Sequence, residues 1–148
     1  MKKILAISIF VFCPIIFSSA QSVDEREVKD VITSAYIEGI QNTGAIEDIR
    51  KGFHPTFNML RLVENEVKPY PIEEWISAIE KRRSDGATST ARTEGKFISV
   101  DITGNAATVK LELYRGGKKT FTDYLVLYKF TEGWRIVSKT YYRHPTEG

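Results

Sequence analysis

The chain is poor in cysteine, histidine and net charge, and each shortage narrows the chemistry available to it. Its one cysteine, Cys13, lies in the apolar N-terminal stretch, so residues 21–148 contain no thiol for a disulfide, a nucleophile or a metal site. The two histidines, His54 and His144, are far apart in sequence, which disfavours a metal site built on histidine. The sequence also lacks a P-loop, a dinucleotide-binding glycine pattern and a Ser-His-Asp arrangement. We therefore expect neither a metal nor a cofactor.

The first twenty residues have the layout of a secretory signal peptide. MKK provides a positive start, ILAISIFVFCPIIF is an apolar run, and SSA supplies small residues before the expected cleavage site after Ala20. The apolar run is short for a membrane span of about 20 residues, and Pro14 interrupts it. We expect an exported protein, periplasmic or secreted, with residues 1–20 as the signal peptide. Residues 21–148 then form one domain without a membrane span.

The charge balance disfavours nucleic acid and anionic membranes as partners. The full chain has 21 Lys and Arg against 19 Asp and Glu, and cleavage removes Lys2 and Lys3, which leaves 19 against 19. A protein that binds polyanions normally needs a basic excess. About 128 residues remain, enough for one domain with a single hydrophobic core.

Three helices are predicted before the strands that start at Ala91. Apolar residues recur at three- and four-residue steps over Asp24–Asn42, with Asp24 placed to cap the first turn. A short helix is expected over Ala45–Lys51, ended by FHP because Pro55 disfavours helix at the residue before it. Pro71 opens the third helix, and the last turn of that helix, KRR, suits the helix dipole better than it suggests an anion site.

Strands dominate the rest of the chain. FNMLRLVENEVKPY predicts a short hairpin, and from Ala91 onward the apolar period changes to two. Four strands are expected, separated by the turn signals TGN, RGG and EG. Helices followed by an antiparallel meander predict an α+β fold in which helices cover one face of a curved sheet.

The last two strands are apolar on both faces. If Glu132 and Gly133 form a two-residue turn, alternation sorts the side chains into two sets. The first set is aromatic with one cation and suits a pocket under the helices: Tyr124, Val126, Tyr128, Val137, Lys139 and Tyr141. The second set mixes large apolar and small polar residues: Asp123, Leu125, Leu127, Lys129, Trp134, Ile136, Ser138, Thr140 and Tyr142. A second copy of the chain would bury the second set, so we expect a homodimer through the sheet.

The order of these elements resembles the nuclear transport factor 2-like (SnoaL-like) superfamily. The closest likeness is to its bacterial putative lumazine-binding family, and it is carried by YIEG (36–39), FHP (53–55), EW (74–75), DYL (123–125), GWRI (133–136) and SK (138–139). The resemblance covers nearly all of residues 21–148. It implies a cone-shaped α+β barrel with a deep apolar pocket, often dimeric through the sheet. The family's name implies a pterin-like ligand, although no residue here selects a pterin.

The superfamily includes ketosteroid isomerases, whose reaction needs a carboxylate base, a tyrosine and a protonated aspartic acid. An ungapped comparison places Tyr36 at the oxyanion tyrosine and the base at Leu60, which cannot abstract a proton. Asp123 is the nearest candidate for the protonated acid, but the alternation above places it on the interface face. No catalytic set is complete, so we expect a binding protein rather than an enzyme.

The candidate pocket residues combine aromatic side chains with cations: Tyr36, His54, Arg61, Trp75, Tyr124, Val126, Tyr128, Lys139 and Tyr141. Such a pocket suits a small apolar or aromatic ligand, including an anionic one. The alternatives are core packing for Tyr36 and Trp75, exposure to solvent for Lys139, and capping or packing for His54. Two other functions stay open. One is a cyclase, isomerase or dehydratase that uses Tyr36 and His54, and the other is a structural dimer in the cell envelope.

Overall fold

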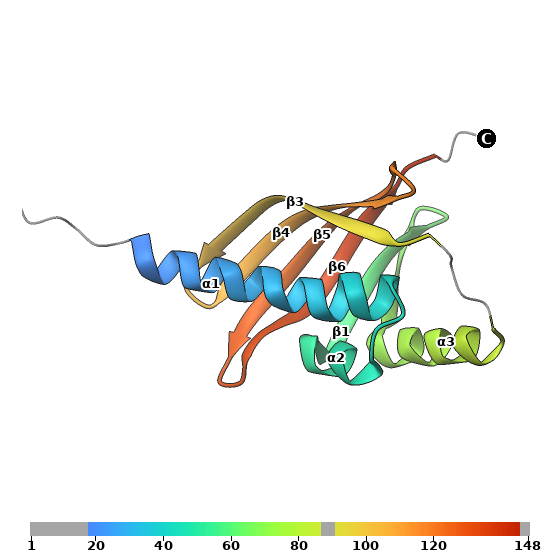
Figure 1. Ribbon diagram of the computed structural model, residues 1–148, viewed down its shortest axis with the longest axis horizontal. Helices are drawn as coiled ribbons and strands as arrows, with labels where there is room; N and C mark the ends of the chain where they lie inside the picture. The colour runs from blue at the N-terminus through green and yellow to red at the C-terminus, as the bar shows by residue number, and fades with distance from the viewer. Residues whose placement is uncertain (1–17, 87–90, 146–148) are drawn as a thin grey trace, which may run out of the picture.

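The computed structural model describes residues 18–86 and 91–145, which form one α+β fold (Figure 1). In chain order the elements are α1 (Ser18–Val31), the π-helix η1 (Ile32–Gln41), α2 (Ile46–Gly52), β1 (Phe53–Val63), β2 (Glu66–Pro71), α3 (Ile72–Ser84), β3 (Thr93–Thr103), β4 (Ala106–Arg115), β5 (Lys118–Phe130) and β6 (Gly133–Arg143). The strands form one sheet in the order β2-β1-β6-β5-β4-β3. Of the predicted signal peptide, residues 1–17 lie outside the described part of the chain.

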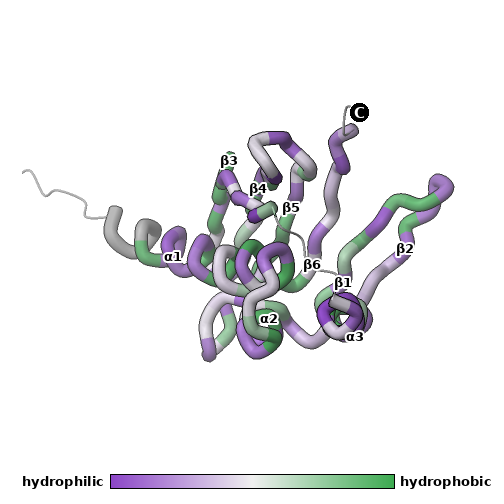
Figure 2. Tube along the Cα trace, turned by 45° about the vertical axis from the view of Figure 1, so that its right-hand side comes forward, coloured by the Kyte–Doolittle hydropathy of each residue, from purple (hydrophilic) through white to green (hydrophobic). Residues whose placement is uncertain are grey.

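The predicted architecture is confirmed: N-terminal helices lie against one face of a curved sheet (Figure 1). All neighbouring strands are antiparallel except β1 and β6, which run parallel. The sheet curves as in an α+β cone but stays open, with β2 and β3 as its two edges. Figure 2 shows the β1–β2 hairpin extending away from α1 and α2.

The first predicted helix is present, but it starts before Asp24 and changes to π geometry at Ile32. Asp24 therefore does not cap it. Its carboxylate instead accepts hydrogen bonds from Lys129 Nζ at 2.5 Å and from Trp134 Nε1 at 3.2 Å. These two bonds tie the helix to the end of the β5–β6 hairpin. A π-helix is uncommon in proteins and frequently marks a functional site.

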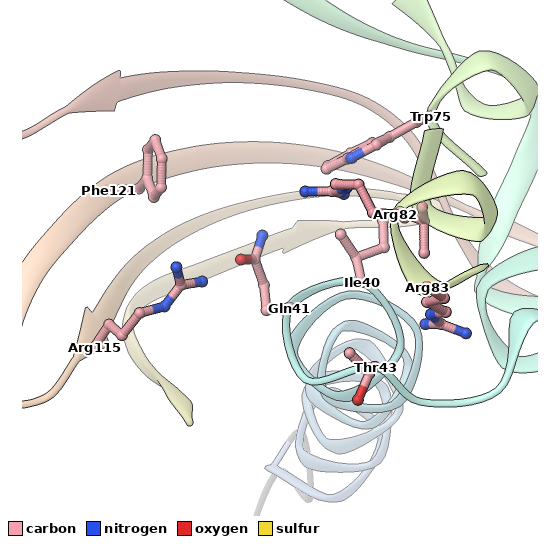
Figure 3. A pocket seen from close by; sticks show the side chains of 9 residues that line it. Ile40, Gln41, Thr43, Trp75, Arg82, Arg83, Arg115 and Phe121 are labelled. Carbon is pink, nitrogen blue, oxygen red and sulfur yellow. The ribbon is translucent and has the colours of Figure 1, made fainter. Parts of the chain in front are cut away.

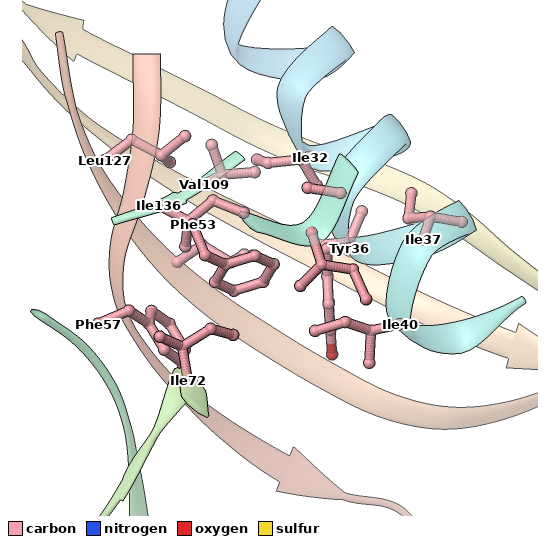
Figure 4. Packing of buried hydrophobic residues seen from close by; sticks show 14 of the residues in the cluster. Ile32, Tyr36, Ile37, Ile40, Phe53, Phe57, Ile72, Val109, Leu127 and Ile136 are labelled. Carbon is pink, nitrogen blue, oxygen red and sulfur yellow. The ribbon is translucent and has the colours of Figure 1, made fainter. Parts of the chain in front are cut away.

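One hydrophobic core fills the space between the helices and the sheet (Figure 4). The core is made of the apolar side chains on one side of each helix and the inward-facing side chains of the strands. Its largest fully buried members are Ile32, Tyr36, Ile49, Phe53, Phe57, Ile76, Leu111, Leu113, Leu125, Leu127 and Ile136. The helices pack closely here. A Cβ on Gly52 would lie 2.3 Å from Cβ of Ala35, so only glycine lets α2 approach η1 at this point.

The register of the last hairpin differs from the predicted one. The turn is formed by Thr131 and Glu132, not by Glu132 and Gly133, so Phe130 pairs with Gly133. Near this turn the expected alternation holds, but the set that faces the helices is the one assigned to the dimer interface. Its members Leu125, Leu127, Trp134 and Ile136 are all buried.

A β-bulge in β6 reverses the faces of the β6 side chains that follow it. Leu127 pairs with Ile136 but Val126 pairs with Ser138, which leaves Val137 as an extra residue. One extra residue moves every following side chain to the opposite face. Lys139, at 3% exposure, consequently lies on the same inner face as Leu125, its partner on β5.

Candidate functional site

An inner cavity of about 140 Å³, partly open to solvent, lies between η1, α3 and the inner face of the sheet. Its walls combine aromatic and apolar side chains with one amine and one amide: Tyr36, Gln41, Met59, Trp75, Phe121, Lys139 and Tyr141. The rings of Tyr36 and Trp75 meet edge-on with centroids 6.0 Å apart. The rings of Phe121 and Tyr141 do the same at 5.7 Å. The cavity is thus mostly aromatic, with its polar groups concentrated at one end.

Three buried polar side chains meet at that end. Lys139 Nζ donates hydrogen bonds to Asp123 Oδ1 and, at 2.8 Å, to the hydroxyl of Tyr36. The Tyr36 hydroxyl in turn donates to Asp123 Oδ2 at 2.6 Å. Asp123 and Tyr36 are 0% and 1% exposed, so this cluster is removed from bulk water. A buried carboxylate is held in place here by two donors, one of them a cation.

Burial shifts the protonation equilibria of this cluster. The pKa of Lys139 is lowered because burial disfavours its ammonium form, and the neighbouring Asp123 carboxylate offsets part of that effect. The pKa of Tyr36 is raised well above its ordinary value, first by burial and then by the charge of Asp123. Tyr36 is therefore a neutral hydroxyl at physiological pH. The Lys139 ammonium also lies 4.8 Å and 4.9 Å from the ring centroids of Tyr36 and Tyr141, which stabilises a cation at this position.

An outer chamber of about 320 Å³ shares Gln41, Trp75 and Phe121 with the inner cavity. Its lining adds the three arginines Arg82, Arg83 and Arg115 and contains no carboxylate: Ile40, Gln41, Thr43, Trp75, Ile79, Arg82, Arg83, Arg115 and Phe121. In the described part of the chain none of the three arginines forms an ion pair. The chamber is therefore a cationic cavity that adjoins an aromatic one.

The arginines are held by neutral acceptors. Arg115 donates from Nε and Nη2 to Thr93 Oγ1 at 3.2 and 3.1 Å, and Arg82 donates from Nε to the carbonyl of Ala78 at 3.3 Å. In Figure 3 the guanidinium groups of Arg82 and Arg115 point toward the same space as the amide of Gln41, whereas that of Arg83 points elsewhere. Positive charge that is positioned but not neutralised suits an anion.

A separate cavity of about 400 Å³ lies where α1, η1 and α2 meet the β5–β6 turn, and it shares no lining residue with the other two. Its walls carry charges of both signs, among them Asp48, Lys51, Glu132 and Arg135. Mixed charges that neutralise one another do not favour any one kind of ligand. We therefore take the inner cavity and the outer chamber as the candidate site.

Four of the predicted pocket residues lie together on the inner cavity: Tyr36, Trp75, Lys139 and Tyr141. Lys139 and Tyr141 reach it only through the bulge at Val137. Tyr36 and Trp75 lie in or against the core as well as on the cavity wall, and their role in binding stays a prediction.

Three predicted pocket residues on β5 were assigned to the wrong face. Tyr124 and Tyr128 are 48% and 47% exposed, and Val126 lies between them on the outer side of the sheet. The alternation along β5 was predicted correctly, but the helices cover the set of side chains that was assigned to the interface. Conversely, Asp123 is not at an exposed interface but fully buried beneath the helices, paired with Tyr36 and Lys139.

Two further predictions were wrong because the residues lie outside both chambers. The His54 ring stacks on Phe130 with centroids 4.8 Å apart, and its Nδ1 accepts from the backbone N–H of Thr56 at 3.2 Å. This is the packing role that the sequence left open for His54. The guanidinium of Arg61 lies over the ring of Tyr70 at 4.4 Å, on the β1–β2 hairpin.

Sequence reasoning missed several lining residues. Trp75, Ile79 and Arg82 are spaced at i, i+4 and i+7, a helix-face pattern that could have placed Arg82 beside Trp75. Alternation from the buried Phe57 could have indicated Met59. No sequence signal marks Gln41, Phe121 or Arg115 as site residues, because they come together only through the fold.

Neither metal clusters nor membrane helices are found in the described part of the chain. Across residues 18–86 and 91–145, no group of three or more His, Cys, Asp or Glu side chains is arranged to hold a metal ion. The helices described in those same ranges are too short or too polar to span a membrane.

Comparisons with known proteins identify relatives across almost the whole domain. The model of a family described as putative lumazine-binding matches residues 23–142. Among curated proteins, the chain is similar to Aldolase FrzH from Cladobotryum sp., with 26% identity over 129 residues that cover 85% of this chain and 98% of that protein.

Solved structures share the fold. An NTF2-like protein of unknown function from Shewanella baltica aligns with a TM-score of 0.66 and 22% identity, covering 84% of this chain and 97% of that one. A second such protein, from Silicibacter pomeroyi, aligns with a TM-score of 0.60 and 20% identity, covering 84% and 96%. A de novo designed protein with a curved β-sheet aligns at 0.52 with 14% identity, covering 77% and 98%.

The buried ion pair generates a prediction about stability. Lys139→Met should lower the free energy of unfolding by about 3–5 kcal/mol, because it leaves the Asp123 carboxylate buried without its cation. The double variant Lys139→Met/Asp123→Leu should recover most of this loss, since no buried charge remains. Urea denaturation measures both, with the exposed Lys118→Met as a control that should stay within about 0.5 kcal/mol of the parent. A double variant as unstable as the single one would contradict a charge-based origin of the loss.

Proposed function

The chain belongs to the putative lumazine-binding family of nuclear transport factor 2-like proteins, and we propose that it binds a small aromatic molecule bearing an anionic group. The observation that carries this proposal is the adjoining pair of cavities, one lined mostly by aromatic side chains and the other by arginines. The fold by itself does not select a function, because this kind of scaffold hosts binding proteins and enzymes alike.

The cavity volumes limit the size of the ligand. The inner cavity, at about 140 Å³, is close to the ~150 Å³ of an engineered apolar cavity that binds benzene. One six-membered ring therefore fills it. A second ring or a polar substituent would occupy the outer chamber, between Trp75 and the arginines. A bicyclic ligand such as a pterin would have to span both.

The anionic group would lie in the outer chamber. Arg82 and Arg115 converge there with the Gln41 amide, and no lining carboxylate competes for them. A carboxylate or phosphate would replace water on both guanidinium groups with charge-assisted hydrogen bonds. Lys139 serves the site differently, because its charge is already matched by Asp123.

We also propose that the protein is an exported homodimer. The signal-like first twenty residues support export. The open face of the sheet supports the dimer, since Tyr124, Tyr128 and Tyr142 are between 47% and 58% exposed on it. Of the set of residues first assigned to the interface, the helices cover Leu125, Leu127 and Ile136, whereas Tyr142 lies on this open face.

A second candidate function is proton transfer next to a carbonyl group. It is favoured by the buried cluster of Asp123, Tyr36 and Lys139, of which Tyr36 and Lys139 line the cavity, and by the similarity to a protein named an aldolase. Asp123 would act as the base and Tyr36 would hold the developing oxyanion. His54 has no part in this version, because it lies outside both chambers.

The binding proposal is tested with 4-methylbenzoate, whose ring fits the inner cavity and whose carboxylate can reach the arginines. Isothermal titration calorimetry should detect binding, and Arg82→Gln and Arg115→Gln should each weaken it about 10- to 100-fold, the equivalent of one charged hydrogen bond. Arg135→Gln, which lines the separate cavity, is the matched control and should leave affinity unchanged. Titration with lumazine under the same conditions tests whether a pterin ring binds more tightly than 4-methylbenzoate. The proposal fails if no aromatic carboxylate binds.

The dimer and export are tested together by native mass spectrometry of protein from the host's envelope fraction. We expect a dimer whose subunits begin at Gln21. Val126→Lys should give monomers, because it puts a charge in the centre of the proposed interface. Leu62→Lys alters the exposed β1–β2 hairpin instead and should leave the dimer intact. Dissociation by Leu62→Lys alone would move the interface to the hairpin.

The proton-transfer alternative is tested with 4-acetylbenzoate in D₂O. NMR should show exchange of the acetyl protons catalysed by the protein, and Asp123→Asn should slow it about 100-fold, a typical contribution of a general base. Arg135→Gln should not change the rate. Exchange no faster than in buffer would remove this candidate while leaving the binding proposal untouched.

A further inference from the structure

We propose that Lys139 forms a Schiff base with an aldehyde or ketone that enters the inner cavity, which gives the protein a covalent carbonyl chemistry. The proposal rests on the proposed binding of a small anionic aromatic molecule at the same site. It extends that function by naming the reactive group of the ligand and the side chain that captures it.

The position of Lys139 supports a reactive role. It is the one amine among the described residues that line the inner cavity, and its side chain is 3% exposed, so only a molecule inside the cavity can reach it. Because this side chain is so little exposed, little water contacts Nζ, and water would otherwise favour hydrolysis of the imine. The bulge at Val137 is what places Lys139 on the cavity wall, because regular pairing would turn the lysine side chain to the outer face of the sheet.

A lysine needs its neutral amine to attack a carbonyl carbon. Burial lowers the pKa of Lys139 and so favours that form. Asp123 Oδ1 is hydrogen-bonded to Nζ and can accept the proton that the ammonium gives up. Tyr36 Oη also contacts Nζ, at 2.8 Å, and its raised pKa keeps it a neutral donor. A base and an acid are thus already in contact with the amine.

The reaction balances without any further reagent. Asp123 takes a proton from the ammonium, and the lone pair of Nζ forms a bond to the carbonyl carbon. The carbonyl oxygen gains one proton from the added amine and one from Asp123, and it leaves as water. The product is a protonated imine, so the single positive charge stays on Nζ beside the restored Asp123 carboxylate.

The surroundings that stabilise the ammonium therefore stabilise the product as well. The ring centroids of Tyr36 and Tyr141 lie 4.8 and 4.9 Å from Nζ and favour a cation in either state. The expected substrate class follows from the two chambers. It is an aldehyde or ketone attached to a ring that fills the inner cavity, with an anionic group that reaches Arg82 and Arg115.

The experiment uses 4-carboxybenzaldehyde, which carries an aldehyde in the place of the methyl group of 4-methylbenzoate. The purified protein is incubated with this probe and sodium cyanoborohydride near pH 7, and the reduced adduct is located by peptide mass spectrometry. Lys139 should be labelled at least about tenfold faster than exposed lysines such as Lys118, because the bound probe holds its aldehyde beside Nζ. An excess of 4-methylbenzoate should block the label on Lys139 but not that on Lys118.

Lys139→Arg is the matched variant, because it keeps a cation beside Asp123 but cannot form an imine. It should lose the label that 4-methylbenzoate blocks, while surface lysines such as Lys118 keep theirs. Labelling confined to surface lysines, in a parent protein that binds 4-methylbenzoate, overturns the Schiff base and leaves the binding function standing. If neither compound binds, both proposals fail. The comparison within the parent protein decides the matter even if Lys139→Arg does not fold.

Discussion

The pairing of the Lys139 ammonium with the Asp123 carboxylate is the interaction on which the site depends. Each charge would be costly to bury alone, and each is buried only because the other is in hydrogen-bond contact. Tyr36 completes the cluster by donating to Asp123 and accepting from Lys139. The cluster therefore joins η1 to β5 and β6 through polar contacts, at a point where the core would otherwise be entirely apolar.

The bulge in β6 is what makes this pairing possible. With regular pairing beyond Ile136, Lys139 would face solvent and Asp123 would be left with only the Tyr36 hydroxyl. An unpaired buried carboxylate costs several kcal/mol, so the bulge and the ion pair support each other. Bulges are often found beside binding and active sites because they redirect a side chain in this way. Here the redirected side chain is a lysine on a cavity wall.

The shared fold and the individual site have different origins. A designed protein with a curved sheet aligns with this chain at only 14% identity, which shows that very different sequences can form this kind of backbone. The distinguishing features of this chain are side chains placed on that backbone. They are the arginines of the outer chamber, the aromatic walls of the inner cavity, and the buried Lys139 amine with the Asp123 carboxylate.

Much of the fold could be predicted because it follows from local patterns. The helix stripes, the helix-breaking Pro55 and the period-two strands act over a few residues, and the structure agrees with them. The faces of β5 and β6 could not be predicted, because both faces of this hairpin are apolar. In addition, a bulge reverses the faces of the residues after it and leaves the local pattern equally satisfied. The sequence by itself determined the class of fold, the helix and strand order and four of the cavity residues. Only the tertiary structure decided that Asp123 and Lys139 meet, since a buried charge pair between strands depends on register and on the helices that cover it.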